Sequence, residues 1–503
     1  MTSTIYDKYQ LLPSAEHSDL SNRCQTTMSK QSTTTTSERA EAMEIKSEHS
    51  RNNSTPKSPT ELMTKSANSV RSECTVIHRT SYLETMIHFL KGNIGSGVYA
   101  MGDAIKNAGL LFGSLGTILL GLVCLYNDHI LVQSSVKIRD KLKLPNEPNL
   151  PETIELCFEH GPIVFRKWKT FVKYLVKGFI IATQLGFCSV YFIFVSSTMH
   201  IVMKDHGYEY DFKLYMAMTL VPIALSALIR SLKFLTPVSL LSNVLMLSGV
   251  CLTFYLCSQD LPSISERRLI SDFGTLPLFF GTTIYAFEGI SLVIPLHNEM
   301  KNQKQFSSKL GVLNVGQCFV ILIAVSMGCI AYLKFGDNVQ GSITLNLDRG
   351  IISETVMSSV ALAILLTYAI QFHVAVDVIW WDLVAARGPF KHMLAFEMLL
   401  RIGLVLFTFF LALVVPHLNL FISLIGAMCS TALALVFPAL CDIALRTCPV
   451  EEGRLQSRST TGQAFRFFMD GFTLILALTG FLTGTFYSVV AIVQAFWNET
   501  PIL

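Results

Sequence analysis

Apolar runs of about 20 residues recur along this chain and constrain its fold more than any other feature. An α-helix needs about that length to cross a hydrocarbon core of about 30 Å. A mean hydropathy of +0.47, with 51% hydrophobic and only 15% charged residues, agrees with these runs. The sequence therefore predicts an all-α membrane protein with about eleven transmembrane helices. The runs lie near residues 84, 111, 171, 213, 234, 276, 308, 354, 394, 418 and 470.

The first 80 residues have a different composition. They are rich in Ser and Thr, charged in both signs and poor in aromatic residues, so they cannot bury a core. We expect residues 1–80 to form a disordered cytosolic tail. The predicted division of the rest is 81–260 for helices 1 to 5, 270–445 for helices 6 to 10, 446–469 for a cytosolic loop, and 470–503 for helix 11 with a short outer C-terminus.

Charge between the apolar runs indicates the direction in which the chain crosses the membrane. Lys and Arg gather in alternate loops, with examples at Lys137, Arg139, Arg166 and Lys301. Such loops remain on the cytosolic side of a membrane. With an odd number of spans, this asymmetry predicts a cytosolic N-terminus.

Two polar, glycine-containing interruptions break the first and the sixth apolar runs. They cover Gly92–Gly97 and Phe280–Gly289. Breaking a helix inside hydrocarbon costs several kcal/mol per exposed polar group unless a partner fills the gap. Because the interruptions are five spans apart, the chain is expected to form a five-plus-five inverted repeat with broken helices 1 and 6, plus one extra helix, and to bind a solute where the breaks meet. The alternative is that these small residues merely allow close helix packing.

An anionic group suits the first break, because its glycines leave peptide N–H groups free after Gly95, Ser96 and Gly97. The carboxylate of an amino acid would fit there, with its amine at carbonyl groups of the second break. Tyr285 and Phe287 are expected to cap the pocket and limit solute size, although an aromatic side chain in a bundle is more often plain core. The predicted substrate-binding residues are Asn93, Gly95, Ser96, Gly97, Phe280, Gly281, Thr282, Tyr285 and Phe287.

Two titratable residues near the breaks are candidates for proton coupling. Glu288 lies in the second break, where an ionisable group costs at least about 3 kcal/mol and usually serves a pathway. The alternative for Glu288 is a protonated carboxyl that bonds its own loosened backbone. His88 lies one turn before Gly92 and should point toward the first gap. Its alternative is a neutral ring that joins two helices.

Several other polar residues lie inside the predicted spans, and we expect them to be mainly structural. Asp103 is expected to face water in an outer vestibule, with a place in the proton pathway as the alternative. The third span carries polar groups that can bond across helices or to a solute, and we rank them below the two breaks. The residues concerned are the i, i+4 pairs Glu397 with Arg401 and His373 with Asp377, and the third-span residues Gln184, Ser189 and Tyr191.

Four stretches carry a resemblance to a known family. Glu84–Gly97, Ala104–Gly109, Thr183–Tyr191 and Ala286–Gly289 resemble proton-coupled amino acid transporters of the amino acid/auxin permease group. The similarity extends over residues 82–495. It implies eleven spans in a five-plus-five inverted repeat, symport of protons with small neutral amino acids such as glycine, alanine or proline, and a coupling role for the histidine that matches His88.

The chain departs from that pattern at three places. Gly102 and Asp103 stand where many relatives have Leu-Pro, and His297 stands where relatives have Glu in a Pro-Leu-Glu-Asn run. The outer loop at residues 200–213 lacks the cysteine that relatives use in an extracellular disulfide. These departures concern substrate identity and coupling more than the fold.

The remaining motifs limit the function. The sequence has no nucleotide loop, no catalytic Ser, His and Asp constellation and no zinc spacing, so neither enzyme chemistry, nor a cofactor, nor a metal, nor a nucleic-acid partner is expected. A proton is the expected coupling ion, and sodium stays open. The alternative function is a lysosomal amino acid sensor that signals to cytosolic partners.

The sequence predicts a sorting signal in the tail. Asp7, Tyr9, Leu11 and Leu12 form overlapping dileucine and tyrosine patterns of the kind that endocytic and lysosomal adaptor proteins read. They predict residence in the plasma membrane, the late endosome or the lysosome.

Overall fold

The computed structural model describes residues 79–230, 232–380, 392–415, 417–447 and 460–499. In these residues the chain is almost entirely helical, and its β-structure there is a single isolated bridge between Thr80 and Met300. The predictions for the tail, including the signal at Asp7, Tyr9, Leu11 and Leu12, lie outside the described residues.

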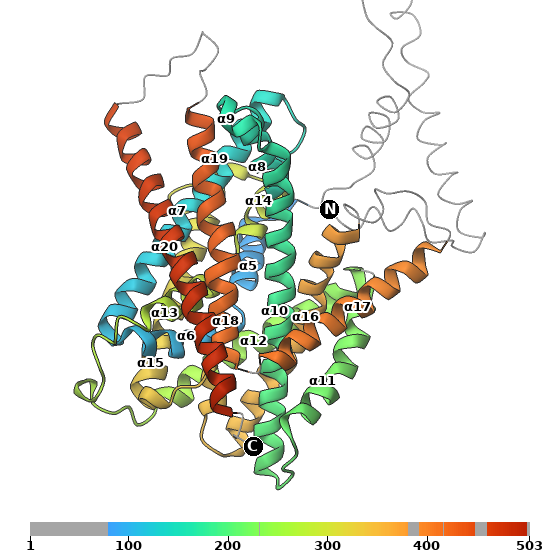
Figure 1. Cartoon of the computed structure of the whole chain (residues 1–503), viewed down its shortest axis with the longest axis vertical. Coiled ribbons are helices and arrows are strands. Elements are labelled where there is room, and N and C mark those ends of the chain that lie inside the picture. Colours follow the sequence, from blue (N-terminus) through green and yellow to red (C-terminus); the bar gives the residue numbers. More distant parts are fainter. Residues whose placement is uncertain (1–78, 231, 381–391, 416, 448–459, 500–503) are drawn as a thin grey trace, which may run out of the picture. The chain divides into compact units, whose positions relative to one another are not determined.

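Eleven helical spans follow one another from Tyr82 onward (Figure 1). Nine described segments are long and apolar enough to cross a membrane, α11 (Phe212–Ala227) is a shorter apolar helix, and α5 with α6 completes the set. The predicted fold class is thus confirmed. The uninterrupted spans are α7 (Leu110–Leu142), α10 (Lys169–Asp205), α11, α12 (Leu232–Ser258), α15 (Val312–Phe335), α16 (Ile351–Ile379), α17 (Met393–Val414) and α20 (Thr460–Glu499).

The first and sixth spans are each two helices. The first consists of α5 (Tyr82–Asn93) and α6 (Ser96–Ala108), separated by extended backbone at Ile94 and Gly95. The sixth consists of α13 (Leu276–Ala286) and α14 (Ile290–Glu299). Both interruptions are shorter than the sequence predicts, because Gly92 and Asn93 continue α5 and residues 280–286 keep the helical backbone of α13. In Figure 1, α5 and α14 lie in the upper half of the bundle and α6 and α13 in the lower half.

Local sequence explains where these helices begin and end. Ser81 and Glu84 form a reciprocal capping box that starts α5. The predicted helix end near Gly109 is confirmed: its φ is +87°, and a β-carbon there would lie 2.7 Å from the Cα of Ile270. The chain therefore turns directly from α6 into α7.

The tenth span is helical throughout but contains two wide turns. It runs through α18 (Leu418–Ile425), π-helical turns at Gly426–Ser430 and Ala432–Val436, and α19 (Phe437–Arg446). Wide turns of this kind are rare and gather at functional positions. Two short helices, α8 (Leu150–Glu159) and α9 (Ile163–Arg166), join α7 to α10.

Contacts between the helices reveal the repeat. Each span from the first to the fifth has a counterpart five spans later, and contacts between the two halves occur in equivalent pairs. The contact of α6 with α15 corresponds to that of α14 with α7, and the contact of α11 with α16 corresponds to that of α17 with α10. The contact of α12 with α16 likewise corresponds to that of α18 with α10. Each half has five spans, so the second half crosses the membrane in the opposite direction to the first. The last helix, α20, stands outside the repeat.

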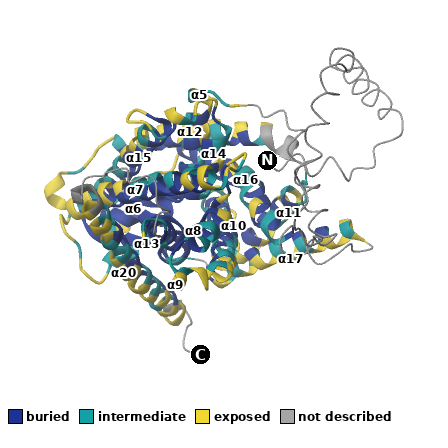
Figure 2. Ribbon diagram, turned by 90° about the horizontal axis from the view of Figure 1, so that it is seen from above, coloured by how far each residue is buried: buried dark blue, intermediate teal, exposed yellow. Residues whose placement is uncertain are grey.

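Burial separates central from peripheral helices. In the most apolar window of α10, 78% of residues are buried, against 28% in α17 and in α20. Figure 2 shows the same difference, with buried residues concentrated on α6, α13 and α10. The two broken spans and the third span therefore form the centre of the bundle, and the peripheral helices present apolar side chains to lipid.

Candidate functional site

The two helix breaks touch each other in a reciprocal way. A β-carbon at Gly97, in the first turn of α6, would lie 2.6 Å from the Cα of Ala286, the last residue of α13. A β-carbon at Gly289, just before α14, would lie 2.3 Å from Oδ1 of Asn93, the last residue of α5. At Gly97 a side chain would collide with backbone, and at Gly289 it would displace the Asn93 amide, so both glycines allow the breaks to approach closely.

The two breaks present different backbone groups to this junction. The N–H groups of Ser96 and Gly97 at the start of α6 have no acceptor within their own helix, and Gly95 supplies no capping side chain, whereas Val98 donates to the Gly95 carbonyl at 3.2 Å. At the end of α13, the carbonyls of Thr283, Ile284 and Tyr285 accept bonds from Phe287 and Glu288, all between 3.2 and 3.3 Å. The junction thus combines the positive end of one helix with the negative end of another.

Tyr285 covers the N-terminus of α6. Its hydroxyl lies 3.0 Å from Ser96 Oγ, and its ring meets Phe187 of α10 edge to face at 4.7 Å. Nearby, Thr282 Oγ1 and Gln184 Oε1 are buried without a hydrogen-bond partner among the described residues. Buried polar groups normally have partners, so these two are free to meet a solute.

Phe280 and Gly281 lie away from the junction. A β-carbon at Gly480 of α20 would lie 2.1 Å from the Phe280 ring, and one at Gly281 would lie 2.3 Å from the Ser423 carbonyl oxygen of α18. Because residues 280–286 are helical, successive side chains point in different directions, and only Thr282, Tyr285 and Ala286 share the face toward α6. The two residues thus pack α13 against the tenth and eleventh spans, and the structure gives them no contact with the break.

His88 does not point toward the first gap, contrary to the expectation. The face of α5 that packs inward carries Thr85, Phe89 and Asn93, whereas His88 is exposed. The helix is rotated so that Phe89 fills the position expected for the histidine. A role for His88 in coupling has no geometric support in this conformation.

Glu288 is buried beside the junction, 8% exposed, and its Oε2 has no hydrogen-bond partner. It faces the wide turns of the tenth span, where Ser430 is close, although that hydroxyl forms no hydrogen bond of normal geometry. Asp128 is a second buried acid, on α7, and α7 packs against α14. Sequence analysis missed Asp128, although Asn127, Asp128 and His129 form a polar triplet in an otherwise apolar run.

The other buried ionisable residues are paired. Arg401 donates to Glu397 at 3.1 Å, as predicted, and His373 lies 3.2 Å from Asp377. Asp103 is only 2% exposed and lies 2.9 Å from Lys106, so the expectation that it faces water is wrong. Its helix turns that face toward the core, where the lysine neutralises the carboxylate.

The third-span residues differ in what their polar groups do. Ser189 donates to the carbonyl of Leu185 in its own helix at 3.0 Å, and Tyr191 is buried on the face that α10 turns toward Tyr285 and α16. Gln184 alone of the three has a buried oxygen without a partner. It is therefore the third-span residue best placed to meet a solute.

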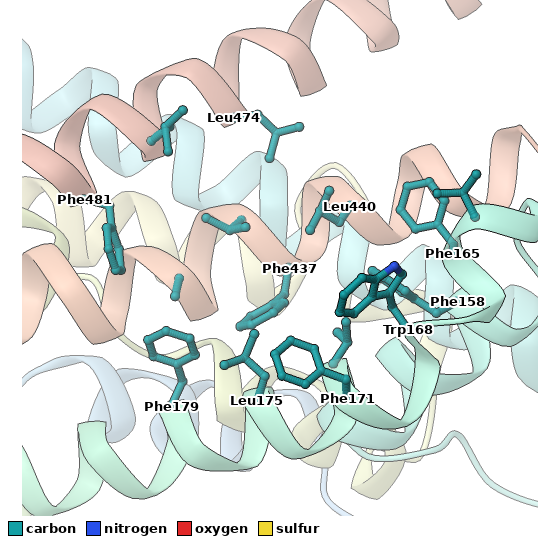
Figure 3. Close-up of a pocket in the computed structure, with 15 residues that line it drawn as sticks. Phe158, Phe165, Trp168, Phe171, Leu175, Phe179, Phe437, Leu440, Leu474 and Phe481 are labelled. Atoms are coloured by element: carbon teal, nitrogen blue, oxygen red, sulfur yellow. The ribbon is translucent and has the colours of Figure 1, made fainter.

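A separate groove of about 540 Å³ lies between α8, α9, α10, α19 and α20 (Figure 3). Its lining is apolar, with Trp168, Phe171, Phe179, Phe437 and Phe481 among the side chains, and it includes no residue of either broken span. An amino acid needs partners for two charged groups, so this groove does not suit one.

Spans that are interrupted in both halves of a repeat and touch at their interruptions are typical of secondary membrane transporters. The chain belongs to the family described as transmembrane amino acid transporter protein, whose model matches residues 78–483. It is 34% identical over 368 residues to the proton-coupled amino acid transporter-like protein pathetic of Drosophila melanogaster, covering 73% of this chain and 77% of that protein. It is 26% identical over 379 residues to amino acid transporter AVT3B of Arabidopsis thaliana, covering 72% and 84%.

Solved structures with a similar arrangement are more distant. The inward-facing structure of Mhp1 covers 83% of this chain and 90% of its own, at 12% identity and a TM-score of 0.46. The structure of MhsT in complex with L-phenylalanine covers 80% and 98%, also at 12% identity and a TM-score of 0.46.

Proposed function

We propose that the chain is a secondary transporter that carries a small neutral amino acid, such as glycine, alanine or proline, together with a proton. The observation that carries the proposal is the reciprocal contact of the two breaks, with a helix N-terminus and a helix C-terminus at one buried junction. A zwitterion needs an anion partner and a cation partner close together, and opposed helix ends supply both.

In this proposal the carboxylate meets the N–H groups of Ser96 and Gly97, and the amine meets the carbonyl end of α13. Tyr285 now bonds to Ser96 and must turn aside when the carboxylate enters. Thr282 and Gln184 offer unpartnered polar atoms to the bound solute. Phe187 and Tyr285 pack edge to face at 4.7 Å beside the N-terminus of α6, and we propose that these rings bound the site.

The two half-helices α5 and α14 can move as one unit. The backbone N–H of Thr80 donates to Glu299 at 2.8 Å, and that of Lys301 donates to Thr80 at 2.9 Å. Beyond the break, Asn93 packs on Gly289. A rocking motion that opens one side of the site would therefore carry both half-helices together.

His297 anchors this unit to the loop that follows α7. Its Nδ1 lies 2.8 Å from Glu147, and Arg139 donates to the same carboxylate at 2.8 Å. A Glu in place of His297 would face the carboxylate of Glu147, so the histidine suits this contact in this chain.

Glu288 is the proposed proton carrier. It is buried, it lies in the break itself, and its carboxyl has an unpartnered oxygen, so a change in its charge acts directly on the junction. His88 is not retained in this role. Sodium coupling is the alternative, and replacing sodium with choline in the uptake buffer separates the two.

Uptake by the purified full chain in vesicles tests the proposal. We expect an inward proton gradient to drive accumulation of glycine, alanine or proline, and we expect Glu288→Gln to abolish the gradient dependence. Uptake that ignores the gradient, or a Glu288→Gln variant with full coupling, would contradict it.

The subcellular location of the protein is a second, separate part of the proposal. The pattern at Asp7, Tyr9, Leu11 and Leu12 is proposed to bind adaptor proteins and to direct the chain to late endosomes or lysosomes, with the N-terminus in the cytosol. Replacing Leu11 and Leu12 with Ala should move the protein to the cell surface without changing transport. Unchanged location would remove this signal from the proposal.

A further inference from the structure

The apolar groove between the third, tenth and eleventh spans is long enough for one lipid chain. Figure 3 shows Phe165 and Trp168 at one end and Phe179 and Phe481 at the other. Phe179 follows Trp168 by eleven residues, which is a helical rise of about 16 Å. Half of a hydrocarbon core of about 30 Å is about 15 Å. The groove therefore matches one leaflet in length, and its inner end lies among the apolar parts of α10 and α20.

The groove is open on the side that faces away from the bundle. Trp168, Phe171 and Leu478 line it, and each of these side chains is more than half exposed. Its floor is buried and includes Ala432 and Phe437 of the tenth span. Hydrocarbon surrounds the outer face of a spanning helix. An apolar groove that opens there is therefore exposed to lipid acyl chains.

Two basic residues lie at the outer end of the groove. Arg166 and Lys167 stand in the sequence between the lining residues Phe165 and Trp168, and both are exposed. Arg166 donates to the carbonyl of Gly161 at 2.8 Å, which leaves its charge uncompensated. Neither basic residue forms an ion pair with any residue that the structure describes. A tryptophan beside basic residues is typical of a membrane interface, so this end of the groove lies at headgroup level.

The neighbouring lysines of α10 differ, because the acids of α8 pair with them. Lys169 lies 2.7 Å from Glu159, and Lys173 lies 2.6 Å from Glu155. These two pairs are neutral as units. The positive charge at the outer end of the groove thus comes from Arg166 and Lys167, and it suits an anionic headgroup.

We propose that this groove binds an anionic phospholipid, with one acyl chain between α10, α19 and α20 and the headgroup phosphate at Arg166 and Lys167. The lipid belongs to the leaflet on the side where the chain enters its first span, which is the cytosolic leaflet in the proposed topology. Basic residues near a membrane surface attract anionic lipids of that leaflet. The seated chain would pack on Ala432 and Val436, which bound the second wide turn of the tenth span. This inference does not rest on the proposed transport.

Lipid binding to the purified full chain in detergent tests the groove. Native mass spectrometry should show tighter binding of phosphatidylserine than of phosphatidylcholine with the same acyl chains. Leu478→Trp places a larger side chain in the groove and should lower phosphatidylserine binding by about tenfold. Leu482→Trp is the matched control, because Leu482 lies one turn further along α20, is 57% exposed against 59% for Leu478, and does not line the groove.

A second pair of variants tests the headgroup contact. Arg166→Gln combined with Lys167→Gln should weaken phosphatidylserine binding by about 25-fold, about fivefold for each basic residue, and should leave phosphatidylcholine binding unchanged. Lys141→Gln combined with Lys143→Gln is the control, because it removes the same charge from exposed residues at the end of α7. Equal weakening by the two double variants would reduce the contact to general surface charge and reject the headgroup site.

The remaining outcomes separate the phospholipid from other occupants. Equal binding of the two phospholipids by the wild type, or equal losses in the two tryptophan variants, would overturn the proposal. Tighter binding of cholesterol would assign the groove to a sterol, and a dimer that is lost only in Leu478→Trp would assign it to a second copy of the chain. Glycerophosphoserine, which has the headgroup without acyl chains, should not compete, and full competition would exclude a role for the groove.

Discussion

Two groups of charges are buried in the spans, and they are built in opposite ways. Glu397 accepts from Arg401 at 3.1 Å and from Arg230 at 2.8 Å, and Arg401 also donates to the carbonyl of Ala227 at 2.9 Å. Asp128 and Glu288, by contrast, are two acids that form no ion pair with a described residue. Glu397, Arg401, Asp128 and Glu288 are almost fully buried, whereas the Arg230 side chain is 35% exposed.

This difference separates charged residues that stabilise the fold from acidic residues that are free to gain or lose a proton. In the Glu397 group one carboxylate is held between two guanidinium groups, and the carboxylate cannot change its charge without breaking both ion pairs. An unpaired acid can change charge when one proton arrives or leaves. The Glu397 cluster joins the ninth span to the end of the fourth span and to Arg230 in the connection that follows it, whereas Glu288 lies in the sixth-span break.

The largest effect is expected from Glu397→Gln. The change removes the carboxylate from the buried Arg401 and from the partly exposed Arg230, and removing one partner of a buried ion pair costs about 3–5 kcal/mol. We expect a large loss of folded protein and a lowered unfolding temperature, measured by size-exclusion chromatography and a thermal unfolding assay in detergent.

Glu288→Gln is the matched comparison for Glu397→Gln, because the same change at an unpaired acid removes no partner. Its unfolding temperature should stay equal to that of the wild type or rise. Equal losses of folded protein in the two variants would contradict the division into ion-paired charges that stabilise the fold and unpaired acids that do not.

The next largest effect is expected from Gly97→Ala. The added β-carbon would meet backbone at 2.6 Å, so α6 and α13 must separate and the site loses its geometry. Small displacements of this kind cost about 10- to 100-fold in rate. Initial uptake rates measure the loss, and Gly178→Ala on α10, where nothing lies within 4 Å of the new carbon, is the control. A Gly97→Ala variant that transports at the wild-type rate would show that close contact of the breaks is not needed for transport.

Hydropathy and the two interruptions were enough to predict the fold. Span length and spacing depend on the bilayer thickness and on backbone hydrogen bonding, and both are local properties of the sequence. The pair at Glu397 and Arg401 was also predictable, because i, i+4 spacing already places its members together.

Other features depend on helix rotation, which apolar runs do not encode. The lipid-facing and core-facing sides of a helix have similar sequences when nearly every residue is apolar. The sequence therefore predicts that His88 lies on the inward face of α5, whereas the structure places Phe89 there. The same ambiguity placed Phe280 and Gly281 at the break, although they contact the tenth and eleventh spans.

A smaller effect is expected from Thr282→Val, in which stability and substrate affinity should change in opposite directions. Its hydroxyl is buried without a partner, so replacing it with a methyl group removes no hydrogen bond and should keep or slightly raise the unfolding temperature. If the hydroxyl meets the substrate, the apparent affinity should fall by about fivefold, equivalent to about 1 kcal/mol. Thr283→Val is the control, because that hydroxyl is equally unpartnered but lies on another face of α13. Equal affinities in the two variants would exclude Thr282 from the site.

The smallest effect is expected at an exposed pair outside the membrane. Lys169 donates to Glu159 at 2.7 Å, and this bond lowers the pKa of the Glu159 carboxyl below its ordinary value of 4.5. A lowered pKa in the folded state stabilises the fold above the ordinary pKa, and this contribution is lost as the pH falls through the folded-state value. Because both side chains are about two-fifths exposed, solvent limits the pair to at most about 1 kcal/mol. Glu159→Gln should thus lower the unfolding temperature slightly and equally at pH 6 and pH 8, and a loss as large as that of Glu397→Gln would show that exposure does not separate the two kinds of ion pair.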